Sequence, residues 1–213
     1  TDTALSIKGT MDSLVDVLGQ WTSQREQYFR VLHLGNGQGK LFQRIIKMLP
    51  LNSDYHYLLA DAEVCGNVEM LIEDYPQAQV SQIDFESADD WNEFTDQQAP
   101  FDLVIVNETL HAHTHPDRLL QTLRSAMNAE SLLLCMEKNP YRLADITFGL
   151  DDDYWHRTTN PENPTPLRLH VNKWASLTQS AGFTDTQAIS DDPDKISGSY
   201  LLLARNEAAP EVQ

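Results

Sequence analysis

The chain has 213 residues, and its 41% hydrophobic and 22% charged residues are typical of a single globular domain. Asp and Glu number 32 against 15 Lys and Arg, which gives a formal charge of −17. This excess of negative charge argues against a nucleic-acid partner and against an anionic membrane surface, because both require a basic face. No apolar run approaches the ~20 residues of a transmembrane helix.

The cysteine and histidine pattern predicts no disulfide framework and no metal site. Cys65 and Cys135 are the two cysteines, and neither belongs to a CxxC pair. Because residues 1–14 also lack a signal-peptide pattern, we expect a reducing, cytoplasmic compartment. His111, His113 and His115 alternate, but histidines at a strand end are more often hydrogen-bonded structural or catalytic groups than metal ligands.

Predicted strands alternate with predicted helices along most of the chain. Residues 1–28 hold one amphipathic helix, from Met11 to Trp21, and we interpret this segment as part of a lid or linker. Strands are predicted at 31–34, 55–60, 79–83, 101–106, 131–137, 183–189 and 199–204, and helices at 40–49, 63–75, 116–127 and 172–181. A Pro-rich loop covers 160–166, and the tail 207–213 is expected to be loose.

This order, βαβαβ, then βαβ after a gap without a predicted helix, then αββ, predicts an α/β fold for residues 29–206. We expect a doubly wound, Rossmann-like sheet of seven strands, mostly parallel, with helices on both faces. The last two strands are close enough in sequence to form a hairpin, so the final strand is expected to be antiparallel. Ligands of such sheets bind at the carboxyl ends of the strands, where Gly35, Asp61, Asp84 and Asn107 stand.

The loop 35–39, Gly-Asn-Gly-Gln-Gly, follows the first strand. We assign Gly35, Asn36, Gly37 and Gly39 to cofactor binding, although a plain strand-to-helix turn is an equally good interpretation of the glycines alone. A dinucleotide fingerprint would place a third glycine where Lys40 stands, and the chain has no P-loop motif.

The residues at the other strand ends suggest what the cofactor is. Asp61 could accept the ribose hydroxyl protons, or it could simply cap a helix. Asp84 could accept from an adenine amino group and Phe85 could stack on the ring, with a turn acid beside a core Phe as the alternative. An acidic, arginine-poor site of this kind suits an adenosyl ligand without phosphates, such as S-adenosylmethionine (SAM). Asn107 is assigned to the same site.

Three segments resemble the C-methyltransferase domain of polyketide synthases, a class I SAM-dependent methyltransferase, over about residues 25–205. Residues 31–39 resemble the family's first motif, and 101–112, which ends in Leu-His-Ala, resembles its fourth. Residues 148–150, Phe-Gly-Leu, with the Tyr-Trp pair at 154–155 and the later Gly-Phe at 182–183, are similar to a third stretch. The Leu-His-Ala and Phe-Gly-Leu segments are the specific ones, since methyltransferases in general share only the glycine loop.

The resemblance implies C-methylation of a β-ketoacyl thioester on an acyl carrier protein, within a synthase whose neighbouring domains are further partners. His111 and Glu137 match the family's catalytic His and Glu. His111 would take the α-proton to form an enolate, and Glu137 would hold its tautomer. Phe148, Tyr154 and Trp155 are assigned to substrate binding, with a lid that packs on the core as the alternative.

The sequence departs from the family pattern at three places. His33 stands where an acidic residue is usual, Gln38 and Lys40 replace a Thr and a Gly, and the N-terminal segment is shorter than the family's lid. These differences bear on SAM affinity. Two other functions therefore stay open: a catalytically inactive pseudo-methyltransferase domain with a structural role, and a small-molecule O- or N-methyltransferase.

Overall fold

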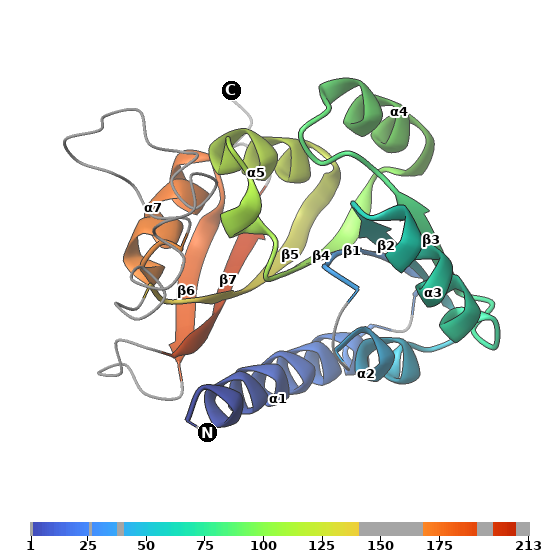
Figure 1. Cartoon of the computed structure of the whole chain (residues 1–213), viewed down its shortest axis with the longest axis horizontal. Helices are drawn as coiled ribbons and strands as arrows, with labels where there is room; N and C mark the ends of the chain where they lie inside the picture. Colours follow the sequence, from blue (N-terminus) through green and yellow to red (C-terminus); the bar gives the residue numbers. More distant parts are fainter. Residues whose placement is uncertain (1, 26, 38–40, 141–167, 191–197, 208–213) are drawn as a thin grey trace.

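The computed structural model describes residues 2–25, 27–37, 41–140, 168–190 and 198–207, with only the backbone for 2–7 (Figure 1). The described part is a three-layer α/β structure in which helices cover both faces of one sheet (Figure 1). None of the described helices is long and apolar enough to cross a bilayer. The Pro-rich loop 160–166 and the tail from 208 onward lie outside the described residues.

The sheet has seven strands in the order β3-β2-β1-β4-β5-β7-β6. The first five strands pair in parallel, and β7 runs antiparallel between β5 and β6. The predicted fold class is therefore confirmed, including the hairpin of the last two strands. The strands are β1 (Phe29–Leu34), β2 (Ser53–Leu59), β3 (Ala78–Gln82), β4 (Phe101–Asn107), β5 (Met127–Lys138), β6 (Thr184–Ser190) and β7 (Ser199–Asn206).

The central strands are buried on both faces because helices flank them on both sides. In β4, Leu103 and Ile105 point to one face, while Val104 and Val106 point to the other, as the two-residue period of a strand requires. The helices α1 (Asp2–Ser23), α2 (Leu41–Met48) and α3 (Ala62–Ile72) cover the first face, and α4 (Ala88–Gln98), α5 (Pro116–Ser125) and α7 (Val171–Ser180) cover the second.

The helix α1 belongs to the core of the domain. It begins at Asp2, well before the predicted start at Met11, and it ends at Ser23. Leu14 and Leu18 are fully buried and belong to the same cluster as Phe29 and Leu201 of the sheet. The N-terminal helix is therefore one of the layers that exclude water from the sheet.

The helices α4 and α5 also differ from the sequence prediction. The helix α5 ends at Ser125, where the Ala126 N–H closes the last helical turn on the Thr122 and Leu123 carbonyls. The next residue, Met127, already pairs with β4 as part of β5. The spacing of apolar residues does not predict the helix α4, because Trp91 is its one buried residue. Its capping signals are clear: Ser87 accepts from the Asp90 N–H, and acidic residues fill the first turn.

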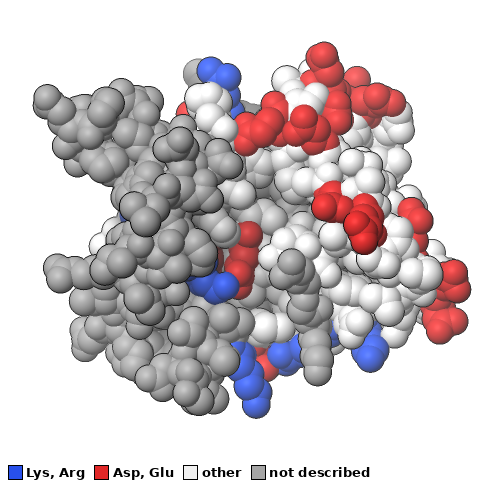
Figure 2. Space-filling model, in the orientation of Figure 1, with Lys and Arg blue, Asp and Glu red and all other residues white. Residues whose placement is uncertain are grey.

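Acidic side chains cover the surface of α3 and α4 (Figure 2). On α4 these are Asp89, Asp90, Glu93 and Asp96, all exposed. The formal charge of −17 is thus concentrated in part over the helices that flank β3 and the neighbouring loops.

Candidate functional site

A cavity of about 410 Å³ lies at the carboxyl ends of β1 to β4. Among the predicted residues, Gly35, Asn36, Asp61, Asp84 and Phe85 line it. Four polar residues that were not assigned to the site also line it: Glu86, Glu108, Thr109 and His113. A larger hollow of about 650 Å³ lies at the opposite ends of the strands and contains none of the predicted site residues.

The glycine loop rests on a tyrosine of the neighbouring strand. The Tyr57 hydroxyl accepts a hydrogen bond from the Gly37 N–H at 3.1 Å, and Gly37 adopts a φ of 67°, which favours glycine. A methyl group on Gly35 would meet the Tyr57 hydroxyl at 2.5 Å. The two glycines are therefore needed for the loop to lie this close to β2. Gly39, Gln38 and Lys40 lie outside the described residues.

We expect Gly35→Ala to weaken binding of S-adenosylhomocysteine (SAH), the demethylated form of SAM, by tenfold or more. The Tyr57 ring is buried and cannot yield, so the loop must move, at a cost of about 1–3 kcal/mol. Calorimetric titration with SAH measures the affinity. Gly66→Ala is the matched control, because nothing lies within 4 Å of its added methyl group. Equal SAH affinity in both variants would contradict the role given to the loop.

Asp61 caps α3 and lines the cavity at the same time. Its Oδ1 accepts from the Glu63 N–H at 2.8 Å and the Val64 N–H at 3.1 Å. The two interpretations of Asp61 are therefore compatible: the cap uses one carboxylate oxygen and fixes the side chain at the mouth of the cavity, which leaves Oδ2 outside the capping bonds.

Asp84 and Phe85 form the wall after β3. Asp84 Oδ1 accepts from the Glu86 N–H at 2.9 Å, which closes a tight turn. Phe85 stacks on Trp91 with ring centroids 6.0 Å apart and packs against the core. The turn therefore presents a fixed aromatic side chain to the cavity.

Beyond β4 the chain bends sharply beside the cavity. Glu108 has a φ of 52°, and its carboxylate pairs with the Lys138 ammonium at 2.5 Å. Asn107, which the sequence assigns to the site, does not line the cavity and is 6% exposed. Two buried oxygens here, Asn107 Oδ1 and Thr109 Oγ1, have no hydrogen-bond partner among the described residues. Unpaired buried oxygens are costly, and of these two residues Thr109 lines the cavity, where a ligand could supply a donor.

The residues present fit an adenosyl ligand. Asp61, Asp84, Glu86 and Glu108 bring carboxylates to the cavity wall, and its described lining contains no Lys or Arg. Such a wall disfavours phosphates and favours a cation such as a sulfonium. Phe85 supplies an apolar face, and Thr109 an unpaired oxygen.

His111 and Glu137 are brought together at the ends of β4 and β5. Glu137 is 1% exposed and accepts two hydrogen bonds, from His111 Nδ1 at 2.8 Å and from the Leu110 N–H at 2.9 Å. The His111 side chain is 21% exposed, so the ring remains accessible. His111 does not itself line the cavity, but Thr109 and Ala112 on either side of it do.

The three alternating histidines lie in different surroundings. His113 is buried, lines the cavity and pairs with Glu86 through Nδ1 at 3.2 Å. His115 is exposed at the start of α5. Among the described residues no group of three His, Cys, Asp or Glu side chains could hold a metal ion. Cys65 and Cys135 are both buried and free.

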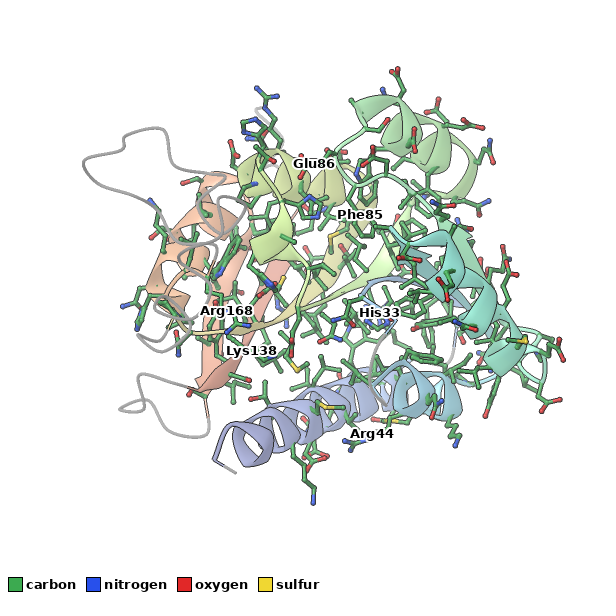
Figure 3. All side chains as sticks on the ribbon, in the orientation of Figure 1. His33, Arg44, Phe85, Glu86, Lys138 and Arg168 are labelled. Carbon is green, nitrogen blue, oxygen red and sulfur yellow. The ribbon has the colours of Figure 1, made fainter. Side chains whose placement is uncertain are left out.

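His33 lies under the glycine loop, on the face covered by α1 and α2 (Figure 3). It is fully buried, its Nδ1 lies 2.6 Å from the Tyr55 hydroxyl, and its ring stacks on Tyr57 at 4.5 Å. Burial lowers the pKa of His33 to about 3, so the ring is neutral at pH 7. His33 thus supports Tyr57, which in turn holds Gly37.

The depressed pKa of His33 predicts a loss of stability in mild acid. The unfolded chain takes up a proton below pH 6.5, whereas the folded chain does not until about pH 3. Stability contributed by the neutral ring is therefore present above pH 6.5 and falls as pH drops, by about 2 kcal/mol at pH 5. Urea unfolding at pH 7 and pH 5 measures this. His33→Phe should reduce the difference in unfolding free energy between pH 7 and pH 5. An unchanged difference would show that His33 is not buried in its neutral form.

The remaining predicted residues, Phe148, Tyr154 and Trp155, lie outside the described residues. Glu86, Glu108, Thr109 and His113 were missed because their positions depend on how the loops after β3 and β4 approach each other. The H-x-H-x-H pattern does point to His113, although it does not predict the contact with Glu86.

Comparison with known sequences finds relatives among polyketide synthases. The non-reducing polyketide synthase Preu3 of Preussia isomera is 24% identical over 198 residues, which is 91% of this chain and 8% of the synthase. The 6-hydroxymellein synthase cdmE of Talaromyces verruculosus is 28% identical over 194 residues, 82% of this chain and 7% of that protein. The chain spans less than a tenth of the length of these relatives. No family model matches it.

Solved structures match over about half of their own length. The CMeT domain of the citrinin polyketide synthase has a TM-score of 0.78 at 14% identity, over 93% of this chain and 52% of that one. The CurJ carbon methyltransferase has a TM-score of 0.73 at 21% identity, over 85% and 49%. The trans-methyltransferase CalH, solved with SAH, has a TM-score of 0.72 at 18% identity, over 90% and 54%.

The sheet order, the antiparallel β7 and these neighbours define a class I methyltransferase fold. Within that class, the sequence relatives are polyketide synthases and the structural neighbours include a C-methyltransferase domain of such a synthase. The resemblance predicted from the sequence is thereby confirmed.

Proposed function

We propose that this chain is a SAM-dependent C-methyltransferase domain of a polyketide synthase. It methylates the α-carbon of a β-ketoacyl thioester that is tethered to an acyl carrier protein through phosphopantetheine. The observation that carries the proposal is the 2.8 Å contact of His111 with the buried Glu137, next to an acidic cavity. The sequence relatives and the fold support the same reaction class.

The cavity residues hold the cofactor. Gly35 and Asn36, which line the cavity, would hold it through their backbone, and we assign Gly37 and Gly39 to the same glycine loop. Asp61 binds the ribose hydroxyls through the oxygen that α3 does not need. Phe85 would supply an apolar face for the adenine and Asp84 a hydrogen-bond acceptor, and we assign Asn107 to the same site. Bound SAM supplies an electrophilic methyl group on a positively charged sulfur, which the substrate carbon accepts.

His111 provides the base. Glu137 receives the Nδ1–H, so the Nε2 of the neutral ring has a free electron pair that takes the α-proton of the thioester. The C–H electron pair becomes the enolate, and the imidazolium that forms is stabilised by the Glu137 carboxylate. The Leu110 N–H holds the other Glu137 oxygen, so the carboxylate cannot rotate away.

The partners follow from the synthase context. A carrier protein delivers the acyl chain, and neighbouring synthase domains share its cytoplasmic compartment. We assign the acyl chain to Phe148, Tyr154 and Trp155. The acidic surface of α3 and α4 would repel an acidic carrier, so docking should occur away from these helices (Figure 2).

One observation favours an inactive pseudo-methyltransferase domain as the second candidate. His33 is buried and neutral at a position where the resembled family usually has an acid, so no carboxylate is available there for the amino-acid end of SAM. Retention of the His111–Glu137 contact favours the active form.

Two measurements test the proposal. Calorimetric titration with SAM and SAH should show binding, and no binding at millimolar ligand would leave only the inactive candidate. Incubation with SAM and a β-ketoacyl pantetheine thioester should add a methyl group at the α-carbon, located by mass spectrometry. A methyl group found on oxygen or nitrogen would instead identify an O- or N-methyltransferase.

A further inference from the structure

Glu86 and His113 form a second histidine–carboxylate pair in the cavity wall, and the reaction proposed above does not use it. Glu86 follows Phe85 in the loop after β3, and both residues, labelled in Figure 3, line the cavity. His113 comes from the segment after β4, and its ring centroid lies 5.5 Å from that of Phe85.

This pair is held in place from both loops. One Glu86 oxygen, Oε1, accepts from the Thr114 N–H at 2.8 Å and lies 3.2 Å from His113 Nδ1. Phe85 is fixed from behind by Trp91, whose indole N–H donates to the Phe85 carbonyl at 3.0 Å. His113 is 4% exposed although Glu86 itself is exposed. Phe85, Glu86 and His113 therefore form a fixed part of the cavity wall.

The protonation of His113 follows from these contacts. Burial lowers the pKa of His113 against the opposing effect of Glu86, so the ring is neutral at pH 7. With a carboxylate at Nδ1, the single proton of the neutral ring resides there and is donated to Glu86. The other nitrogen, Nε2, is then a hydrogen-bond acceptor.

We propose that His113 Nε2, fixed by Glu86, selects a 6-amino purine by accepting a hydrogen bond from its exocyclic amino group. Phe85 supplies the apolar face for the same ring. A 6-oxo purine would bring an oxygen acceptor against an acceptor nitrogen and would be rejected. This inference rests on the proposed function, because it concerns the adenosyl end of the same cofactor. An amino group has two hydrogens, so Asp84 can accept the second.

The test compares SAH with S-inosylhomocysteine, its 6-oxo analogue, by calorimetric titration. We expect the unaltered chain to bind SAH at least about tenfold more tightly. His113→Phe keeps an aromatic ring of similar size without the nitrogens, and should reduce this ratio at least about fivefold. His115→Phe is the matched control, since His115 is exposed and does not line the cavity, and it should leave the ratio unchanged.

The outcomes separate the two proposals. If the unaltered chain binds neither SAH nor SAM, the proposed function fails. If it binds SAH but His113→Phe retains the full preference over the 6-oxo analogue, the role of His113 is wrong and the proposed function stands. Should His113→Phe not fold, as judged by circular dichroism, Glu86→Ala replaces it. That change removes the oxygen that receives the Nδ1 proton, and a loss of preference is again expected.

Discussion

His111→Ala is expected to lower the rate of C-methylation by about 10²–10⁴-fold while SAH affinity changes by less than about twofold. The substitution removes the nitrogen that takes the α-proton. SAH binding should persist because the His111 side chain does not line the cavity. The rate is measured by mass spectrometry with SAM and a β-ketoacyl pantetheine thioester, and the affinity by calorimetry.

Proton removal can also be observed without the cofactor. In D₂O, the unaltered chain should speed deuterium exchange at the α-carbon of the thioester, and His111→Ala should reduce the exchange to the background rate. The control His115→Ala should leave both rates unchanged, because His115 lies on the surface at the start of α5. A variant that methylates at the normal rate would show that His111 is not the base.

Glu137→Gln is expected to reduce the methylation rate by about 10³–10⁴-fold and to leave the fold intact. The new amide has one acceptor and one donor. The Leu110 N–H needs the acceptor, because two buried donors facing each other would be costly. The amide N–H₂ therefore faces His111 Nδ1, which must then accept, and the imidazole proton moves to Nε2. The atom that should remove the α-proton is then already protonated.

Two comparisons identify this tautomer effect. Glu69→Gln, an exposed residue of α3, should have no effect on the rate. The double variant with His111→Ala should be no slower than His111→Ala alone, because the two residues act as one unit. Additive losses in the double variant, or an unfolded Glu137→Gln protein by circular dichroism, would contradict the proposed role of Glu137.

The contact between His111 and Glu137 could be anticipated because the resemblance assigns both residues and the order of the strands brings them together. Alternation of apolar runs and helices predicts parallel strands, and neighbouring parallel strands end at the same edge. β4 and β5 are neighbours in the sheet, so residues just beyond their ends must meet. The same argument brings Gly35, Asp61 and Asp84 to one cavity.

The residues that the sequence did not assign depend on side-chain packing between loops. The Glu86–His113 pair requires the loop after β3 to fold toward the segment after β4, and no periodicity encodes that approach. Glu108 has a positive φ and an ion pair with Lys138, which sequence spacing does not predict. His33 could be recognised only as a departure from a pattern, and the structure supplies its surroundings: two tyrosines and no solvent.

The burial of α1 has a practical consequence for recombinant work. Leu14 and Leu18 cover the part of the sheet that includes Leu134 and Leu201. A shortened protein that started at Phe29 would keep every strand of the sheet. It would, however, expose to water the apolar surface that α1 covers. Such a truncation should precipitate on expression, and any binding assay performed on it would report aggregation instead of ligand affinity.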